Sequence, residues 1–170
     1  RMHYRDCAAL MDAEAASEPM RKQETYWLEK LGGVLPELRL PGAFPRPAGD
    51  SFTGAHVHTR IEPEETRKLR ALAKATGTSL FTVLMSVYKI LLHRLTGVED
   101  VLVGTIVSGR NKPEFEDIVG MFVNTIVLRS RLRPDLAFQD LAKSVRKTTL
   151  EALQHQDYPF ESLVEKLAPR

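Results

Sequence analysis

Apolar residues recur every three or four positions along much of this chain, and that spacing predicts amphipathic helices. The strongest example covers residues 80–96, whose apolar face is broad enough that we expect it to pack against a sheet. Its main positions are Leu80, Leu84, Val87, Leu91 and Leu95. Further helices are predicted over residues 4–31 (divided near Pro19), 63–76, 136–154 and 160–167. We therefore expect helices packed on a smaller sheet.

Three stretches have the pattern of strands. Residues 55–61 alternate apolar and polar side chains, which is typical of a strand buried on one face. Residues 101–107 are apolar almost throughout, as expected of a strand covered on both faces. The third stretch, residues 122–132, is apolar at its start except for Asn124. The order of elements predicts an α/β (α+β) layered sandwich, a mixed sheet with helices packed on it.

Composition excludes several classes of protein. The 24 basic and 22 acidic residues give a net charge of +2, which makes no electrostatic case for nucleic acid or an anionic membrane. No apolar run approaches the roughly 20 residues of a membrane span, and no signal peptide opens the chain, so we expect a cytoplasmic protein. Residues 35–49, dense in proline and glycine, are expected to be an extended surface connection.

Few side chains suggest chemistry of their own. Cys7 is the only cysteine, so the chain has no internal disulfide, and its alanine neighbours favour a small buried thiol over a nucleophile. His56 and His58 share one face of their predicted strand, but no third metal ligand is evident, and we expect no metal site. No histidine has a partner in the sequence that would make it a general base.

Asn124 is the polar residue that most needs an explanation. It shares a predicted strand face with Phe122, Ile126 and Leu128, and a buried amide without a partner costs on the order of 1–3 kcal/mol. Asn124 is therefore either a structural amide bonded to nearby backbone or a polar group facing a channel for an amide or thioester substrate. The residue alone favours the structural interpretation.

Two other features allow both structural and functional interpretations. Gly104 and Gly120, in or beside strands, mark either bulges or places where a ligand approaches the backbone. Residues 155–161 end one helix and begin another, with Pro159 in the first turn, Asp157 accepting from free N–H groups and Phe160 inserted into the core. For that segment we favour a structural role over catalysis by His155.

Three segments resemble motifs of the condensation domains of nonribosomal peptide synthetases. Residues 120–125 with Arg129 are similar to the Gly-x-Phe-Val-Asn-Thr motif, and residues 155–161 match the motif that follows it, His-Gln-Asp-Tyr-Pro-Phe-Glu. Residues 4–8 resemble the Tyr-x-Asp-Tyr-Ala motif, with Asp6 in place and Cys7 replacing the usual aromatic. The resemblance extends over nearly the whole chain, and residues 122–125 distinguish it from the related epimerisation and heterocyclisation domains.

This resemblance implies a fold of two lobes, each related to chloramphenicol acetyltransferase, with residues 1–170 as the C-terminal lobe. The catalytic motif of the family, His-His-x-x-x-Asp-Gly, does not occur in the chain. We therefore expect the lobe to be incomplete at both ends, lacking the N-terminal catalytic lobe and the final strands. It would carry no catalytic residue, and the isolated chain would be inactive.

The resemblance also assigns roles and partners. Gly120, Phe122 and Asn124 would lie along a substrate tunnel between the lobes. The residues with structural roles would be Asp6, Arg129, Asp157, Pro159 and Phe160. The parent would be an amide-forming acyltransferase whose partners are its own N-terminal lobe and the donor and acceptor carrier domains.

In this family the carrier domains bear 4′-phosphopantetheine, and this chain would bind no cofactor directly. One alternative is a non-catalytic condensation-like module that recruits carrier domains or tailoring enzymes. A free-standing acyltransferase acting on a soluble thioester is a third possibility. Neither the amino acids joined nor the product follows from the residues of this chain.

Overall fold

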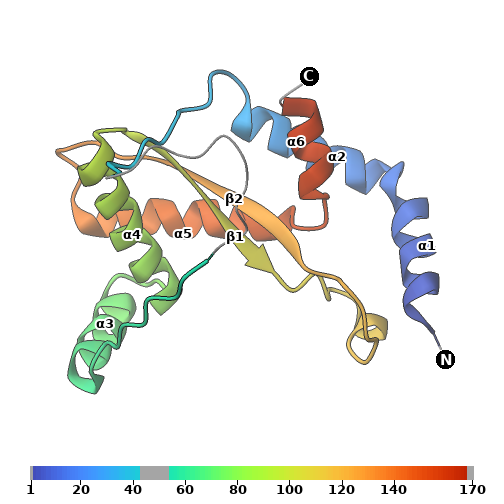
Figure 1. Cartoon of the computed structure of the whole chain (residues 1–170), viewed down its shortest axis with the longest axis horizontal. Helices are drawn as coiled ribbons and strands as arrows, with labels where there is room; N and C mark the ends of the chain where they lie inside the picture. The colour runs from blue at the N-terminus through green and yellow to red at the C-terminus, as the bar shows by residue number, and fades with distance from the viewer. Residues whose placement is uncertain (1, 43–53, 168–170) are drawn as a thin grey trace. The chain divides into compact units, whose positions relative to one another are not determined.

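The computed structural model describes residues 2–42 and 54–167, which form helices and one small sheet (Figure 1). The elements in chain order are α1 (Tyr4–Ala15), α2 (Glu18–Leu31), α3 (Pro63–Ala75), α4 (Leu80–Thr96), β1 (Asp100–Val107), η1 (Pro113–Phe115), β2 (Asn124–Arg131), α5 (Phe138–Gln154) and α6 (Phe160–Leu167). The helices predicted from periodicity are therefore confirmed, and most of their predicted ends lie within two residues of the observed ends.

The residues group into two compact units. The first comprises Arg1–Pro36, Leu102–Ser130 and Lys147–Arg170, and the second comprises Glu37–Val101 and Arg131–Arg146. In the first unit α2 packs on α6, and in the second α3 packs on α4. Each unit is described separately below.

Capping residues explain where the helices of the first unit begin and end. The Ser17 hydroxyl accepts from the Met20 N–H at 3.3 Å, Pro19 lies in the first turn, and α2 ends at Gly32. At the start of α1 the Asp6 carboxylate accepts from the His3 N–H at 2.9 Å, forming half of a capping box. Asp6 thus fixes the first turn of α1.

The sheet is smaller than the sequence pattern suggested. Among the described residues only β1 and β2 pair, and they form a two-stranded antiparallel sheet rather than a mixed one. The predicted strand over residues 55–61 is wrong, since residues 54–62 form neither helix nor strand and are exposed. Alternation gives a segment one apolar face, but a strand also needs a neighbour for its backbone groups, and the described chain offers it none.

Helix α4 has the predicted bounds, but most of the apolar side chains that were expected to be buried are exposed, and several polar ones are buried. The Ser79 hydroxyl caps its start, accepting from the Thr82 N–H at 3.1 Å, and Gly97 ends it with φ 71°. Its buried residues are Thr82, Val83, Ser86, Lys89 and Leu92. The apolar positions Phe81, Leu84, Val87, Tyr88, Leu91 and Leu95 are exposed. The expectation that this apolar face packs against a sheet is therefore wrong for the described residues.

The connection predicted over residues 35–49 lacks helix and strand as far as residue 42, and its remainder lies outside the described residues. In the part of the chain that the structure describes, no single helix has the length and apolar character to cross a membrane. Helices α3 and α4 reach that length and composition only as a pair bent by 100° at their junction.

Candidate functional site

The side chain of Asn124 joins the start of β2 to the turn between α5 and α6. Its amide Nδ2 donates to the carbonyl oxygens of Gln156 at 2.7 Å and Tyr158 at 2.8 Å. Its Oδ1 accepts from the Phe160 N–H at 3.2 Å, at the start of α6. Both amide protons and one oxygen lone pair of this half-buried residue are therefore used by the protein itself.

The same turn is held on its other side by α2. The Trp27 indole N–H donates to the His155 carbonyl at 2.8 Å, and the Tyr26 ring stacks on the His155 imidazole at 3.8 Å between centroids. Burial, followed by the nearby Glu151 carboxylate, raises the pKa of Tyr26 to about 12. The His155 Nδ1 lies 2.7 Å from the Glu151 carbonyl oxygen, so this imidazole is occupied by contacts within the fold.

The hydrogen-bond partners of Asp157 and the burial of Phe160 differ from the expectation. The Asp157 carboxylate accepts from the side-chain amides of Gln23 and Asn111 rather than from the first turn of α6. Pro159 immediately precedes α6, and its carbonyl accepts from the Leu163 N–H at 3.2 Å. The aromatic residue buried at this turn is Tyr158, whereas Phe160 is half-buried. The expectation that Phe160 enters the core is therefore corrected.

Phe122 lies in a small buried cluster with Cys7 and Phe115. The rings of Phe115 and Phe122 have centroids 5.1 Å apart, and Tyr4 meets Phe122 edge-on at 5.3 Å. Cys7 is completely buried, so the prediction of a small buried thiol is confirmed. Its position beside Phe122 connects α1 to the segment that precedes β2.

Position 120 requires glycine because of a contact with Tyr4 that the sequence analysis did not predict. A Cβ at this position would lie 2.1 Å from Cδ2 of Tyr4, and the Tyr4 hydroxyl donates to the Met121 carbonyl at 2.8 Å. The Tyr4 ring thus packs directly on the backbone of Gly120. The two residues are far apart in sequence, and the only available signal was that both lie in the recognised motifs.

Arg110 holds the loop between β1 and β2 from inside. Its guanidinium donates to the carbonyl oxygens of Phe115, Ile118 and Gly120, and it lies 4.3 Å from the centroid of the Phe122 ring. The preceding Gly109 has φ 65°, and a Cβ there would come within 1.7 Å of the Phe122 oxygen. The segment 119–123 is therefore fixed by several independent contacts.

Arg129 lies further along β2 and binds the end of α2. Its Nη1 donates to the carbonyl oxygens of Lys30 and Gly32, each at 3.2 Å. Carbonyl groups at the C-terminus of a helix lack partners within the helix, so a cation there satisfies them and favours the helix dipole. Arg129 thereby ties β2 to α2 within the first unit.

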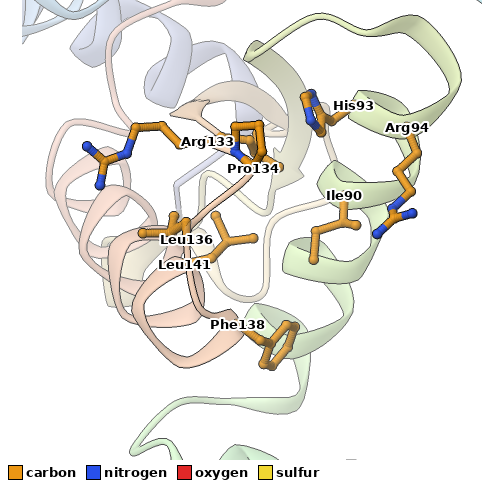
Figure 2. A pocket seen from close by; sticks show the side chains of 9 residues that line it. Ile90, His93, Arg94, Arg133, Pro134, Leu136, Phe138 and Leu141 are labelled. Carbon is orange, nitrogen blue, oxygen red and sulfur yellow. The ribbon is translucent and has the colours of Figure 1, made fainter.

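The second unit contains a buried lysine and a shallow pocket. Lys89 of α4 is completely buried, and this burial lowers its pKa to about 8, partly offset by the Asp100 carboxylate. Figure 2 shows the pocket between α4 and the start of α5, where Ile90, His93 and Arg94 lie across from Pro134 and Phe138. His93 Nδ1 is 2.9 Å from the Val98 carbonyl oxygen, and the lining presents no pair of groups suited to acid–base chemistry.

The remaining histidines give no metal site in the structure. The His56 and His58 rings stack with centroids 6.1 Å apart and are exposed. Within residues 2–42 and 54–167 no group of three or more His, Cys, Asp or Glu side chains is arranged to hold a metal ion.

Comparison with known proteins identifies the family. The family described as "Condensation domain" matches residues 1–170. Tyrocidine synthase 2 of Brevibacillus parabrevis is 42% identical over 168 residues, which are 99% of this chain and 5% of that protein. Surfactin synthase subunit 1 of Bacillus subtilis is 42% identical over 167 residues, which are 98% of this chain and 5% of that protein. The chain thus spans about 5% of the length of these relatives.

Solved structures agree with this result. The first condensation domain of the calcium-dependent antibiotic synthetase, in complex with a substrate analogue, has a TM-score of 0.83 and 28% identity, covering 94% of this chain and 37% of that one. A complex of the X-domain and OxyB from teicoplanin biosynthesis gives a TM-score of 0.89 and 25% identity, covering 98% of this chain and 38% of the X-domain chain. The fold is that of condensation domains. This chain belongs to the condensation-domain family of nonribosomal peptide synthetases, which confirms the resemblance.

Proposed function

We propose that this chain is the C-terminal lobe of a condensation domain that forms peptide bonds between aminoacyl or peptidyl groups held as thioesters on carrier domains. In this proposal the acceptor amine attacks the donor thioester in a tunnel between two lobes, and this lobe supplies one wall. The carrier domains bring their own 4′-phosphopantetheine, and the other lobe of the same domain supplies the catalytic histidine.

The observation that carries the proposal is the rigid support of residues 119–125. Tyr4 and Arg110 donate to backbone carbonyls of this segment, and the Asn124 side chain fixes its end to the turn between α5 and α6, whereas the side chains of Val119, Met121 and Val123 are exposed. A site that positions a substrate needs a backbone held by its surroundings and a side left open. The placement of Gly120, Phe122 and Asn124 along the tunnel belongs to this proposal, with these residues supporting the wall from its protein side.

The described histidines support placing the catalytic group elsewhere. His93 and His155 each have a ring nitrogen within hydrogen-bond distance of a backbone carbonyl, and His3, His56 and His58 are exposed. A general base must reach the proton it removes and must be oriented for that transfer. We therefore propose that residues 1–170 alone do not catalyse condensation.

The test is a condensation assay with two loaded carrier domains, following the dipeptidyl thioester by mass spectrometry. The parent domain is expected to form product, and the same domain with its catalytic histidine replaced by alanine is expected to form at least a hundredfold less. The isolated 170-residue chain is expected to form none above the carrier-only background. Product formation by the isolated chain would refute the assignment of roles.

One comparison favours a second candidate function. The X-domain structure with a TM-score of 0.89 is a complex with a second protein, OxyB, from teicoplanin biosynthesis. By analogy, the parent domain would recruit a tailoring enzyme to carrier-bound peptide without joining amino acids. A parent domain that shows no condensation but binds a tailoring enzyme in size-exclusion chromatography would favour this candidate.

A further inference from the structure

The turn between α5 and α6 is bound by amide side chains from two elements. Asn124 of β2 binds it as described above. The second amide belongs to the half-buried Gln23 of α2, whose Oε1 accepts from the N–H groups of Asp157 at 3.1 Å and Tyr158 at 3.2 Å. The Gln23 Nε2 also donates to the Asp157 carboxylate at 3.5 Å. A single side chain of α2 therefore binds two successive backbone donors of the turn and one of its carboxylates.

The contacts of position 23 require a side chain that accepts and donates at the same time. A glutamine amide has an oxygen that accepts and an NH₂ group that donates, and it carries no charge. An ionised glutamate could accept from the two N–H groups, but it would have no proton to donate to Asp157 and would add a second negative charge beside it. The chemistry of the turn therefore selects an amide at position 23, although Gln23 lies outside the three recognised motifs.

Gln23 and Asn124 meet at the same residue of the turn. The Tyr158 N–H donates to Gln23, and the Tyr158 carbonyl accepts from Asn124 at 2.8 Å. The Tyr158 side chain is buried, and its hydroxyl donates at 3.2 Å to Glu24, the neighbour of Gln23 in α2. The position of the carbonyl that Asn124 binds is therefore set from the α2 side.

We infer that Gln23 is a positioning residue for the condensation reaction. It holds the turn where Asn124 can bind it, and through Asn124 it fixes the end of residues 119–125. The inference rests on the proposed function and deepens it, because that function needs residues 119–125 as a fixed wall. A wall that has shifted still admits the substrate but orients it less well, so loss of Gln23 should lower kcat and change KM little.

The first experiment removes the amide from the parent condensation domain. Gln23→Leu keeps a similar volume and can neither accept nor donate. We expect kcat to fall about tenfold while KM stays within about twofold, at a temperature where circular dichroism shows the variant fully folded. Glu29→Leu is the matched control at an exposed position of the same helix, and it should leave both constants unchanged.

The second experiment restores the lost bonds with a proton. In Gln23→Glu a protonated carboxyl accepts from the turn and donates to Asp157 as the amide does, whereas the ionised form cannot donate. The folded variant holds this proton more firmly than the unfolded chain, in which glutamate ionises near about pH 4.3, because two negative charges would otherwise lie side by side. Its stability and its kcat should therefore be highest at low pH and fall as the pH rises.

The measured quantity is the ratio of kcat for Gln23→Glu to kcat for the parent at each pH. We expect the ratio to fall about tenfold between about pH 5 and pH 8. Gln139→Glu makes the same replacement at an exposed position of α5, and its ratio should not change. The parent and the variant share the other titratable groups around the turn, so their titration cancels. These groups are Glu24, Tyr26, Glu151, His155, Tyr158 and Lys166.

The outcomes separate the inference from the function on which it rests. If the parent domain forms product and fully folded Gln23→Leu keeps its kcat, Gln23 has only a structural role, and the inference fails while the proposed function stands. A ratio for Gln23→Glu that does not vary with pH also overturns the inference, because the shared proton would then have no effect. A parent domain that forms no product overturns the proposed function and the inference with it.

Discussion

Strand β2 and helix α4 show opposite relations between apolar pattern and burial. Along β2 the apolar residues Ile126 and Leu128 are buried, as their pattern predicts, and the Asn124 amide beside them is bonded by the protein itself. In α4 the apolar side is exposed, and the side with Thr82, Ser86 and Lys89 is buried. The apolar pattern thus predicted the buried residues of β2, but not which side of α4 would be covered. Which face is covered depends on neighbours that are distant in sequence.

The largest effect is expected at Asn124. Asn124→Ala removes three hydrogen bonds and leaves two carbonyls and one N–H at the turn without their partner, so the free energy of unfolding should fall by about 3 kcal/mol. Urea unfolding of the 170-residue chain measures this change. Asn111→Ala, which removes an exposed amide of the β1–β2 loop that donates to Asp157 of the turn, is the control and should cost less than about 0.5 kcal/mol.

Asn124→Ala in the parent domain tests whether the Asn124 amide only supports the segment or also faces the substrate. If turnover falls no further than stability does, Asn124 supports the segment from behind. A loss of turnover well beyond the loss of stability would instead place the amide beside the reacting groups, as the family resemblance first suggested. An unchanged free energy of unfolding would contradict the hydrogen-bonding role altogether.

The next largest effect concerns Lys89 and pH. Its pKa in the folded chain, about 8, is lower than the model-peptide value of about 10.5, so between these values the unfolded chain binds more protons. Stability should therefore rise with pH, by roughly 2 kcal/mol between pH 8 and 10. Tyr26 has the opposite shift, to about 12, and lowers stability only above about pH 10.

Urea unfolding across pH 7–10 tests this prediction, with Lys89→Met as the control. Methionine has a similar length and no charge, so the variant should lack the rise that the parent chain shows. If the parent and the variant have parallel curves, the lysine is hydrated in solution and α4 does not bury its polar side.

The sequence predicted the features that depend on residues close together in the chain, but not those that depend on residues far apart in the chain. Helix ends depend on local residues, and the helices predicted over residues 63–76 and 80–96 agree with α3 and α4 to within one residue at each end. The predicted strand over residues 55–61 failed because pairing depends on a remote partner. The site was limited in the same way. Residues 120–125 were found by their motif, but the contact of Tyr4 with Met121, 117 positions apart, is visible only in the fold.

A smaller effect is expected at Arg129. Arg129→Gln keeps much of the side-chain length but loses the charge and the two bonds to the last carbonyls of α2, at a cost of about 1–2 kcal/mol. Circular dichroism during urea unfolding should show a lower midpoint. Arg131→Gln, at an exposed position at the end of the same strand, is the matched control and should leave the midpoint unchanged.

The smallest effect is expected on the exposed face of α4, where the comparison is most directly tested. Leu91 is 51% exposed, so Leu91→Gln should change the free energy of unfolding of the 170-residue chain by less than about 0.5 kcal/mol. Its neighbour Leu92 is buried, and Leu92→Ala should cost about 2–5 kcal/mol by leaving a cavity. The periodicity alone ranks Leu91 as a core position, so it predicts a large loss at Leu91. Urea unfolding of the two variants side by side distinguishes these accounts, because a large loss at Leu91 and a small one at Leu92 would show that α4 buries its apolar side.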